Sequence, residues 1–426
     1  MKRKWAWSMA TVLAATLIGA GGGAGEAQLL PAMPALPGLP GIGRGLSDLP
    51  DPGAAIASVG RISRQAVERL DTVRRETFAR LVRDHPDAIT FDPQGFPARA
   101  GEVVVDAPSD ALLGAAVKAG YTLIERDEVL GVGFARLRVP EGRSLKAALS
   151  EITRLGGGEV SADQLHLPSG VVSGGAPVPA ADSGGRGPWV GVIDGGVDGA
   201  AVVQGFATGA PRANDHGTAV ASLITGGNGV RGALPGARIA SADVYGSDPA
   251  GGNATAIAKA LGGMVRQRVP VATISLVGPA NPLLARVVAA AQARGLIIVA
   301  AVGNGGPMQP LSYPASYPGV VAVTAVDAWD RVLIEAGRAS HVDYAAPGAD
   351  MMAVGVGGRR IKVRGTSFAA PLVAARIAAV YPAPEPGQIR PALARVDASA
   401  RDLGRRGEDK IFGRGVVCAE CRTPAQ

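Results

Sequence analysis

The sequence predicts an α/β protein in which a mostly parallel sheet carries helices on both faces, preceded by a small α+β domain. Short, continuous runs of Val, Ile and Ala alternate with helical stretches between residues 189 and 380. Such runs are typical of parallel strands that are buried on both faces. Upstream, residues 100–167 follow the order β-α-β-β-α-β, which is typical of a ferredoxin-like unit.

The larger domain is expected to span residues 188–418, with helices that begin near His216, Thr255, Pro282 and Thr366. In sheets of this kind, ligand sites form at the carboxyl ends of the strands. Asp194 ends the first expected strand and therefore stands where that rule places chemistry. The expected strands are 190–193, 238–244, 271–276, 296–301 and 320–326.

The smaller domain is expected to contain two helices, Ser109–Ala119 and Arg143–Leu155, of which the first begins at a serine cap. Its four expected strands are Glu102–Val105, Tyr121–Glu128, Gly133–Val139 and Glu159–Leu167.

The first 86 residues contain three segments of different composition. Residues 1–27 combine a basic start, an apolar stretch and a small-residue end, as an export signal does. The alternative is an uncleaved anchor, although the apolar stretch is short for a membrane span. Export predicts a secreted or periplasmic protein. Residues 28–54 are rich in Pro and Gly and predict a linker, and residues 55–86 have the period of an amphipathic helix with a solvated arginine face.

Two further segments are expected to be irregular: residues 168–187, a linker that offers a place for activating cleavage, and the tail 419–426. The two cysteines, Cys418 and Cys421, lie just before and within that tail. A local disulfide suits an exported chain, and free thiols are the alternative. A zinc half-site lacks its second pair, and a redox motif lacks the strand-to-helix context, so no catalytic role is expected.

The net charge of +7 comes largely from seven arginines between Arg61 and Arg83. A basic protein can bind nucleic acid or an anionic membrane. No basic patch with interleaved aromatic residues is present in the sequence, so we expect no nucleic-acid partner. A membrane tether is not expected either, and the anchor alternative keeps it open.

Three short strings each hold one member of a catalytic set. Asp194 stands in Val-Ile-Asp-Gly-Gly, His216 in Asp-His-Gly-Thr, and Ser367 in Gly-Thr-Ser-Phe-Ala-Ala-Pro. Glycine turns let a reactive side chain stand clear of its own backbone. Together the three residues supply a carboxylate, a general base and a nucleophile, the groups that amide hydrolysis requires.

The order Asp, His, Ser and the strings around these residues resemble the subtilisin-like serine endopeptidases (subtilases) over roughly residues 188–418. The resemblance implies that Ser367 is the nucleophile, His216 the general base and Asp194 the carboxylate that orients it. Asn304, in Ala-Val-Gly-Asn after a buried strand, matches the asparagine that donates its side-chain amide to the oxyanion. By residue type alone Asn304 is a turn residue and Ser367 a helix cap. The Ser367 N–H is the second expected oxyanion donor.

Other acids and histidines compete for these roles on residue type alone. Asp198 lies past the strand end, and Asp215 is adjacent to the catalytic histidine, which is a poor geometry for reaching its ring. His85, His166 and His341 are expected to be structural or surface-exposed.

The resemblance also implies a strand that pairs with extended substrate, through main-chain bonds that give affinity and side-chain pockets that give selection. Val277 and Ser312 stand where the family often has Gly, which adds volume at the primary specificity pocket. We therefore expect a preference for Ala, Ser or Val before the scissile bond. A peptide library cleaved best after Phe, Tyr or Leu would contradict this. The expected substrate-binding residues are Ser275, Leu276, Val277, Gly278, Ala301 and Ser312.

The position of the 100–167 unit, directly before the catalytic domain, resembles the inhibitory pro-domain of the family. The chain's own pro-domain is therefore expected to act as an intramolecular inhibitor.

No redox or nucleotide cofactor and no metal-ligating residue is identified. Residues 226–232 contain no carboxylate, so we expect no tight calcium site there, and calcium elsewhere stays open. The Gly-x-Gly-x-x-Gly string at 227–232 follows an expected helix, whereas a dinucleotide site needs a preceding strand.

The expected function is a secreted serine endopeptidase, made as a zymogen, that hydrolyses protein or peptide substrates through an Asp-His-Ser triad and an acyl-enzyme. The alternative is a catalytically silent or pro-segment-restrained subtilase fold that acts as a binding protein.

Overall fold

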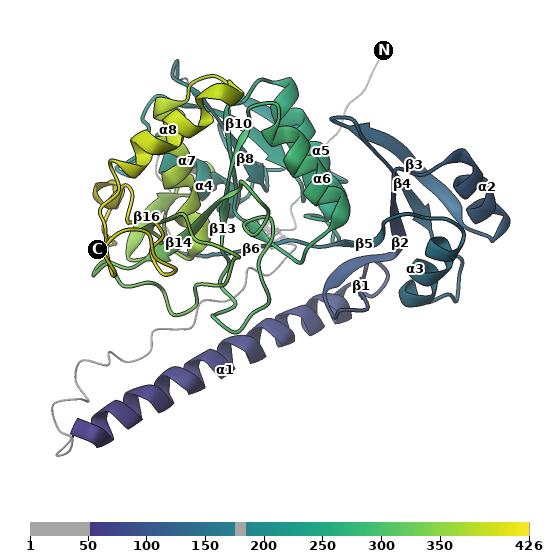
Figure 1. The fold of residues 1–426 in the computed structure, drawn as a ribbon. Helices are drawn as coiled ribbons and strands as arrows, with labels where there is room; N and C mark the ends of the chain where they lie inside the picture. The colour runs from purple at the N-terminus through teal and green to yellow at the C-terminus, as the bar shows by residue number, and fades with distance from the viewer. Residues whose placement is uncertain (1–51, 175–184, 426) are drawn as a thin grey trace, which may run out of the picture.

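The computed structural model describes residues 52–174 and 185–425, which form two packed domains and a long N-terminal helix (Figure 1). The predicted signal peptide, and the predicted linker except for its last three residues, lie outside the described residues.

The smaller domain contains the predicted β-α-β-β-α-β order, which confirms the α+β fold class. Its sheet is antiparallel, with β5, β2, β4 and β3 side by side and a short extra strand, β1, that also pairs with β2. Ser109 caps α2 by accepting a bond from Leu112 N, and Ser144 caps α3 in the same way. The elements are β1 Ile89–Phe91, β2 Pro97–Asp106, α2 Asp110–Lys118, β3 Thr122–Val129, β4 Val132–Arg138, α3 Leu145–Arg154 and β5 Val160–Gln164.

Helix α1, Pro52–Asp84, extends from the smaller domain along the lower side of the larger one (Figure 1). Ala66, Leu70, Thr77 and Leu81 are buried at helical spacing, as the amphipathic pattern predicts. The carbon that a side chain at Gly306 would add lies 3.0 Å from Leu70 Cδ1, so α1 packs directly on the larger domain.

The larger domain contains a sheet of seven parallel strands in the order β15-β14-β13-β11-β8-β10-β9. All five strands that the sequence predicted are present, which confirms the fold class. The strands are β8 Trp189–Asp194, β9 Val202–Gly205, β10 Arg238–Asp243, β11 Val271–Ile274, β13 Ile297–Ala301, β14 Val321–Val326 and β15 Tyr344–Pro347.

Two pairs of helices cover the two faces of this sheet (Figure 1). Helices α4, Asp215–Thr225, and α7, Ala370–Val380, share one apolar cluster with alternate residues of the strands. Helices α5, Ala254–Arg266, and α6, Pro282–Gln292, share the other. A further helix, α8 at Ile389–Asp397, packs on α7.

The prediction of a linker at residues 168–187 is wrong for its first six residues, because residues 167–173 pair with the larger domain. Strand β6, Leu167–Pro168, lies antiparallel to β12, Leu276–Val277. Strand β7, Val171–Ser173, lies antiparallel to β17, Arg360–Arg364, which also pairs with β16, Met351–Val354. The Gly-, Ser-, Ala- and Pro-rich composition of the segment did not predict this pairing, because the strands with which it pairs lie far away in the sequence.

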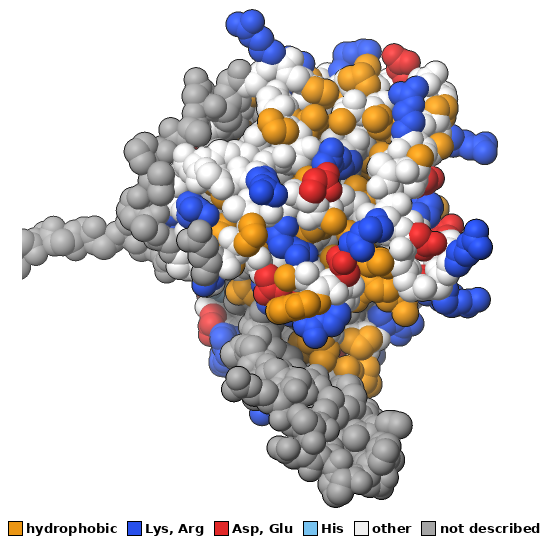
Figure 2. Space-filling view, turned by 90° about the vertical axis from the view of Figure 1, so that its left-hand side faces the viewer, with side chains coloured by type: hydrophobic (Ala, Val, Ile, Leu, Met, Phe, Trp, Pro, Cys, Tyr) orange, Lys and Arg blue, Asp and Glu red, His pale blue; other side chains and the backbone are white. Residues whose placement is uncertain are grey.

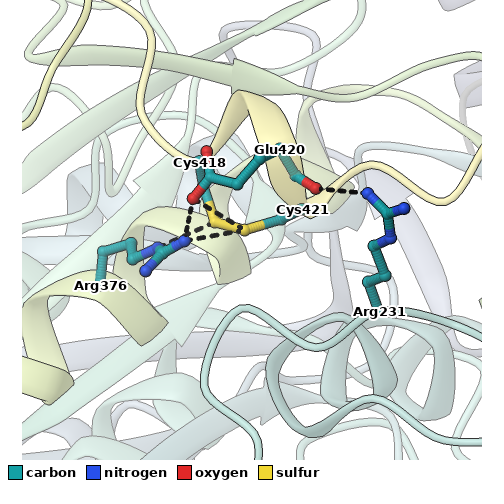
Figure 3. Close-up of a disulfide and its surroundings, with 5 residues drawn as sticks. All are labelled: Arg231, Arg376, Cys418, Glu420 and Cys421. Atoms are coloured by element: carbon teal, nitrogen blue, oxygen red, sulfur yellow. Dashed lines mark hydrogen bonds and ion pairs between the residues drawn. A yellow bond between two sulfur atoms is a disulfide. The ribbon is translucent and has the colours of Figure 1, made fainter.

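The expected tail is likewise packed, since Ala425 N donates to Asp350 O at 3.1 Å; Figure 3 shows the surroundings of the disulfide that precedes it. Cys418 and Cys421 form a disulfide around a short turn, with Cα atoms 5.2 Å apart. Arg376 of α7 contacts Cys418 Sγ and forms an ion pair with Glu420. Met352 N donates to Thr423 O at 2.9 Å, so the C-terminal segment fastens the end of the chain to the larger domain.

Charged side chains are dispersed over the face shown in Figure 2, where Lys and Arg stand among apolar and acidic residues. The net positive charge therefore forms no continuous cationic surface on this face. No helix among residues 52–174 and 185–425 combines the length and apolarity that crossing a membrane requires.

Candidate active site

Asp194 and His216 are held together by a strand end and a helix start. Asp194 ends β8, and His216 is the second residue of α4, whose N-cap Asn214 accepts a bond from Gly217 N at 2.7 Å. His216 Nδ1 lies 2.9 and 3.0 Å from the two carboxylate oxygens of Asp194. Both side chains are buried, so the carboxylate fixes the orientation of the imidazole away from water.

Ser367 lies in the short helical turn η2, Thr366–Phe368, directly before α7. Its hydroxyl donates to Ser275 O at 2.9 Å and lies 2.8 Å from Ser169 Oγ. His216 Nε2 is buried without a hydrogen-bond partner among the described residues. The expected relay is therefore formed between the carboxylate and the imidazole, while the hydroxyl is turned toward Ser275 and Ser169.

Asn304 follows β13, and its amide orientation is fixed by Thr366. Thr366 N and Oγ1 lie 3.1 Å from Asn304 Oδ1, and since the Thr366 N–H can only donate, the oxygen must face it. The amide nitrogen of Asn304 then donates to Ser169 O at 2.6 Å. Ser367 N donates to the same oxygen at 3.0 Å. Two donors thus converge on one backbone carbonyl oxygen.

The chain segment around Ser169 runs extended through the cleft. The N–H of Ser169 donates to Ser275 O at 3.1 Å. The preceding residues of β6 pair with Leu276 and Val277 of β12. Residues 171–173 continue the extended path along β17. Main-chain pairing of this kind is how an extended peptide is held at the edge of a sheet.

The expected pocket residues lie beside this segment. Ser312 Oγ donates to Val302 O at 2.7 Å, and Gly278 pairs through its backbone with Tyr313. Ala301 lies at the end of β13 within the core beneath the cleft. Gln309 was missed, because no motif marks it. Its Nε2 donates to Ser312 Oγ at 2.6 Å and to Val302 O at 3.1 Å.

The rival acids are engaged elsewhere. Asp215 accepts a bond from Val356 N and pairs with Arg359, and Asp198 accepts a bond from Gly357 N.

The other histidines hold different positions. His85 follows the end of α1 and is partly exposed. His341 faces Asp343, whose hydrogen bond raises the pKa of the ring. His166 is fully buried in the segment that precedes Ser169, a place that the sequence did not suggest.

The glycine string 227–232 does not have the geometry of a dinucleotide site. It follows helix α4 and closes a tight turn in which Gly227 and Val230 exchange backbone bonds. Within the described part of the chain, one cluster combines three metal-ligating side chains, Cys418, Glu420 and Cys421, and its two sulfur atoms are joined in the disulfide. Calcium binding stays an open expectation.

Comparison with known proteins shows to which family the larger domain is similar. The family described as "Subtilase family" matches residues 185–415. Subtilisin BL of Lederbergia lenta is 33% identical over 217 residues, which are 49% of this chain and 78% of that protein. The minor extracellular protease Epr of Bacillus subtilis (strain 168) is 29% identical over 211 residues, 48% of this chain and 32% of that protein.

Among solved structures, fervidolysin from Fervidobacterium pennivorans, described as a keratinolytic enzyme related to subtilisin, has the same fold. Its TM-score is 0.63 with 20% sequence identity, and the match covers 78% of this chain and 62% of fervidolysin. The family match covers more than half of the chain and contains Asp194, His216 and Ser367. The protein therefore belongs to the subtilase family of serine endopeptidases.

Proposed function

We propose that this protein is an exported subtilase made as a zymogen, and that its first substrate is its own peptide bond between Ser169 and Gly170. One observation carries the proposal: Ser169 O accepts bonds from both Ser367 N and Asn304 Nδ2. A carbonyl oxygen held by two donors beside a serine hydroxyl is in the position that the oxyanion of acyl transfer takes.

In this proposal Ser367 Oγ attacks the carbonyl carbon of Ser169 while His216 Nε2 takes the hydroxyl proton. Asp194 stabilises the imidazolium, and the two donors hold the oxyanion. His216 then gives the proton to the nitrogen of Gly170, and water releases Ser169 from the acyl-enzyme. Attack requires the Ser367 hydroxyl to rotate from Ser275 O toward His216 Nε2, which has no other described partner. Protein or peptide substrates would later occupy the same cleft.

Contacts between the two domains support the proposal that the N-terminal domain acts as an intramolecular inhibitor. Ion pairs join it to the larger domain, with Arg99 2.5 Å from Asp248 and Asp106 2.7 Å from Arg286. Asp163 is fully buried and accepts a bond from Thr255 N at 3.0 Å, at the start of α5. These contacts do not depend on the 169–170 bond, so the domain should stay docked and keep the cleft filled after cleavage.

Helix α1 adds a further contact beside the site. Leu70 packs against Gly306, two residues after Asn304, and the adjacent Gly305 faces Arg74. The helix would therefore brace the turn that carries the oxyanion donor while the zymogen is intact.

The residue after the scissile bond is confined, which gives a first prediction. A side-chain carbon added at Gly170 would lie 2.5 Å from Phe368 Cε2 and 3.1 Å from Ser367 Cβ. Overpacking of this kind costs about 1–3 kcal/mol. Gly170→Ala should therefore slow processing about 5- to 150-fold, as measured by the time course of precursor loss. Gly158→Ala is the matched control, because the added carbon there meets no atom within 4 Å. Equal processing of both variants would contradict the assignment of the bond.

Docking of residues 165–169 should also depend on pH. Burial lowers the pKa of His166 from 6.5 to about 4, and the Gln164 and Pro279 carbonyls offset this only in part. Neither ring nitrogen has a hydrogen bond of normal geometry among the described residues. The docked state binds fewer protons than the free segment, so docking should weaken by about 3 kcal/mol as the pH falls from 6.5 to 4.

The measurement is the melting temperature of unprocessed precursor, kept intact by Ser367→Ala, across this pH range. His166→Leu should flatten the decrease. Both proteins must carry Ser367→Ala, because a second group also titrates in this range. Burial raises the pKa of Asp163, so its protonation stabilises the folded precursor as the pH falls, opposite to the effect of His166. An unchanged pH dependence in the His166 variant would contradict the prediction.

Export is proposed from residues 1–27, which lie outside the described residues. The relative named an extracellular protease supports it, and a periplasmic location is part of the same proposal.

A second candidate is a subtilase fold restrained permanently by its N-terminal domain and used for binding. It is favoured by the Ser367 hydroxyl, which faces Ser275 O instead of His216. Labelling with a fluorophosphonate probe separates the two, since only an activated serine reacts. The proposal predicts labelling of processed protein, absent in Ser367→Ala. Processed wild-type protein that stays unlabelled would favour the binding candidate.

A further inference from the structure

We infer that Gln309 closes the primary specificity pocket and limits cleavage to bonds that follow small residues, such as Ala or Ser. This inference rests on the proposed function, because it treats residue 169 as the residue before the scissile bond.

The backbone contacts of residue 169 define where its side chain must find room. Its N–H is bound to Ser275 O and its carbonyl oxygen to Asn304 Nδ2, so the residue lies between two chain segments. One segment continues from Ser275 to Val277, and the other precedes Asn304 with Gly303. The recess between Val277 and Gly303 is therefore the nearest space for a larger side chain at position 169.

Three side chains already meet in this recess. The carbon that a side chain at Gly303 would add lies 2.8 Å from Gln309 Nε2, 3.0 Å from Ser312 Oγ and 3.4 Å from Val277 Cγ1. The sequence predicted the effects of Val277 and Ser312, whereas the closest of the three atoms belongs to Gln309. Gln309 is 6% exposed, so it is part of the packed wall and does not lie on the surface.

Hydrogen bonds hold Gln309 in place. Its Nε2 donates to Ser312 Oγ at 2.6 Å and to Val302 O at 3.1 Å, which uses both amide protons. A large residue before the scissile bond would have to displace this amide and leave buried polar atoms without partners. Ser169, the residue that the chain itself presents, is small and makes no such demand.

The test is the ratio of kcat/KM for peptides that differ only in the residue before the scissile bond, Ala or Phe. One methylene more or less in a specificity pocket changes kcat/KM about 10- to 200-fold, so a phenyl ring should reach the upper part of this range. We expect processed wild-type enzyme to prefer Ala by about 100-fold, and Gln309→Ala to raise the Phe-to-Ala ratio at least tenfold. The double variant Gln309→Ala/Ser312→Gly should raise it further. Gln388→Ala is the matched control, because it truncates an exposed glutamine at the start of α8. It should leave the ratio unchanged.

The outcomes separate the inference from the function on which it rests. Enzyme that labels with a fluorophosphonate but cleaves best after Phe or Leu, or whose ratio does not move in Gln309→Ala, overturns the inference and leaves the function standing. Wild-type enzyme that neither labels nor hydrolyses any peptide overturns both. If Gln309→Ala does not fold, Gln309→Ser and the wild-type preference decide the question.

Discussion

Replacing Ser367 with alanine is expected to leave the precursor uncut and to reduce peptide hydrolysis about 10⁶-fold, the loss that follows removal of the nucleophile from a triad of this kind. The Ser367 hydroxyl is 2.8 Å from Ser169 Oγ and is the group that forms the acyl-enzyme in the proposed reaction. His216 and the two oxyanion donors would stay in place, and the uncut segment around Ser169 would also keep external peptides out of the cleft, so both effects lower peptide turnover. The measurement is the intact mass of the purified protein over time, together with its turnover of a small peptide.

Ser399→Ala is the matched control, because this exposed serine follows the end of α8 and should leave processing unchanged. Equal melting temperatures would show that the Ser367 variant is folded. Processing of Ser367→Ala at the wild-type rate in purified protein would contradict the assignment of the nucleophile.

Replacing Asn304 with alanine is expected to lower kcat by about 10²- to 10³-fold, or roughly 2.7–4 kcal/mol of transition-state stabilisation, with a much smaller change in KM. The amide already donates to Ser169 O at 2.6 Å, and charge on that oxygen strengthens the bond as the tetrahedral intermediate forms. Steady-state kinetics of processed enzyme separates kcat from KM.

Asn304 also accepts bonds from Thr366, so a loss of activity alone could have a structural cause. Asn304→Asp keeps an acceptor for Thr366 but has no N–H to donate, and it should be as slow as Asn304→Ala or slower. Activity near the wild-type level in Asn304→Asp would show that the residue acts only by holding Thr366.

Much of the fold and of the catalytic set could be predicted because local signals decide them. The buried Val and Ile runs fix the strands, since only a sheet covered on both faces accommodates them. Asn214, Asn253 and Asn281 cap three of the helices, and each cap stands within two residues of the helix start that the sequence predicted. The strings around Asp194, His216 and Ser367 carry the resemblance to the family.

The remaining features depend on contacts between segments that are distant in the sequence. The pairing of residues 167–173 is imposed by the edges of β12 and β17, and nothing in a Leu-Pro-Ser-Gly string predicts it. A turn returns the Gln309 side chain toward Val302, and no motif marks that turn. Helix α8 was not predicted, because no capping side chain marks its start at Ile389. The direction of the Ser367 hydroxyl depends on Ser169 and Ser275, which are far away in the chain.

The most direct test of the whole account is the mass of the first pair of fragments that purified precursor releases. We predict a cut between Ser169 and Gly170, so that the N-terminal fragment ends at Ser169 and the C-terminal fragment begins Gly170-Val171-Val172. The same cut should be absent from Ser367→Ala. A first cut anywhere else, in particular between residues 175 and 187, would contradict the claim that the 169–170 bond is held ready for attack.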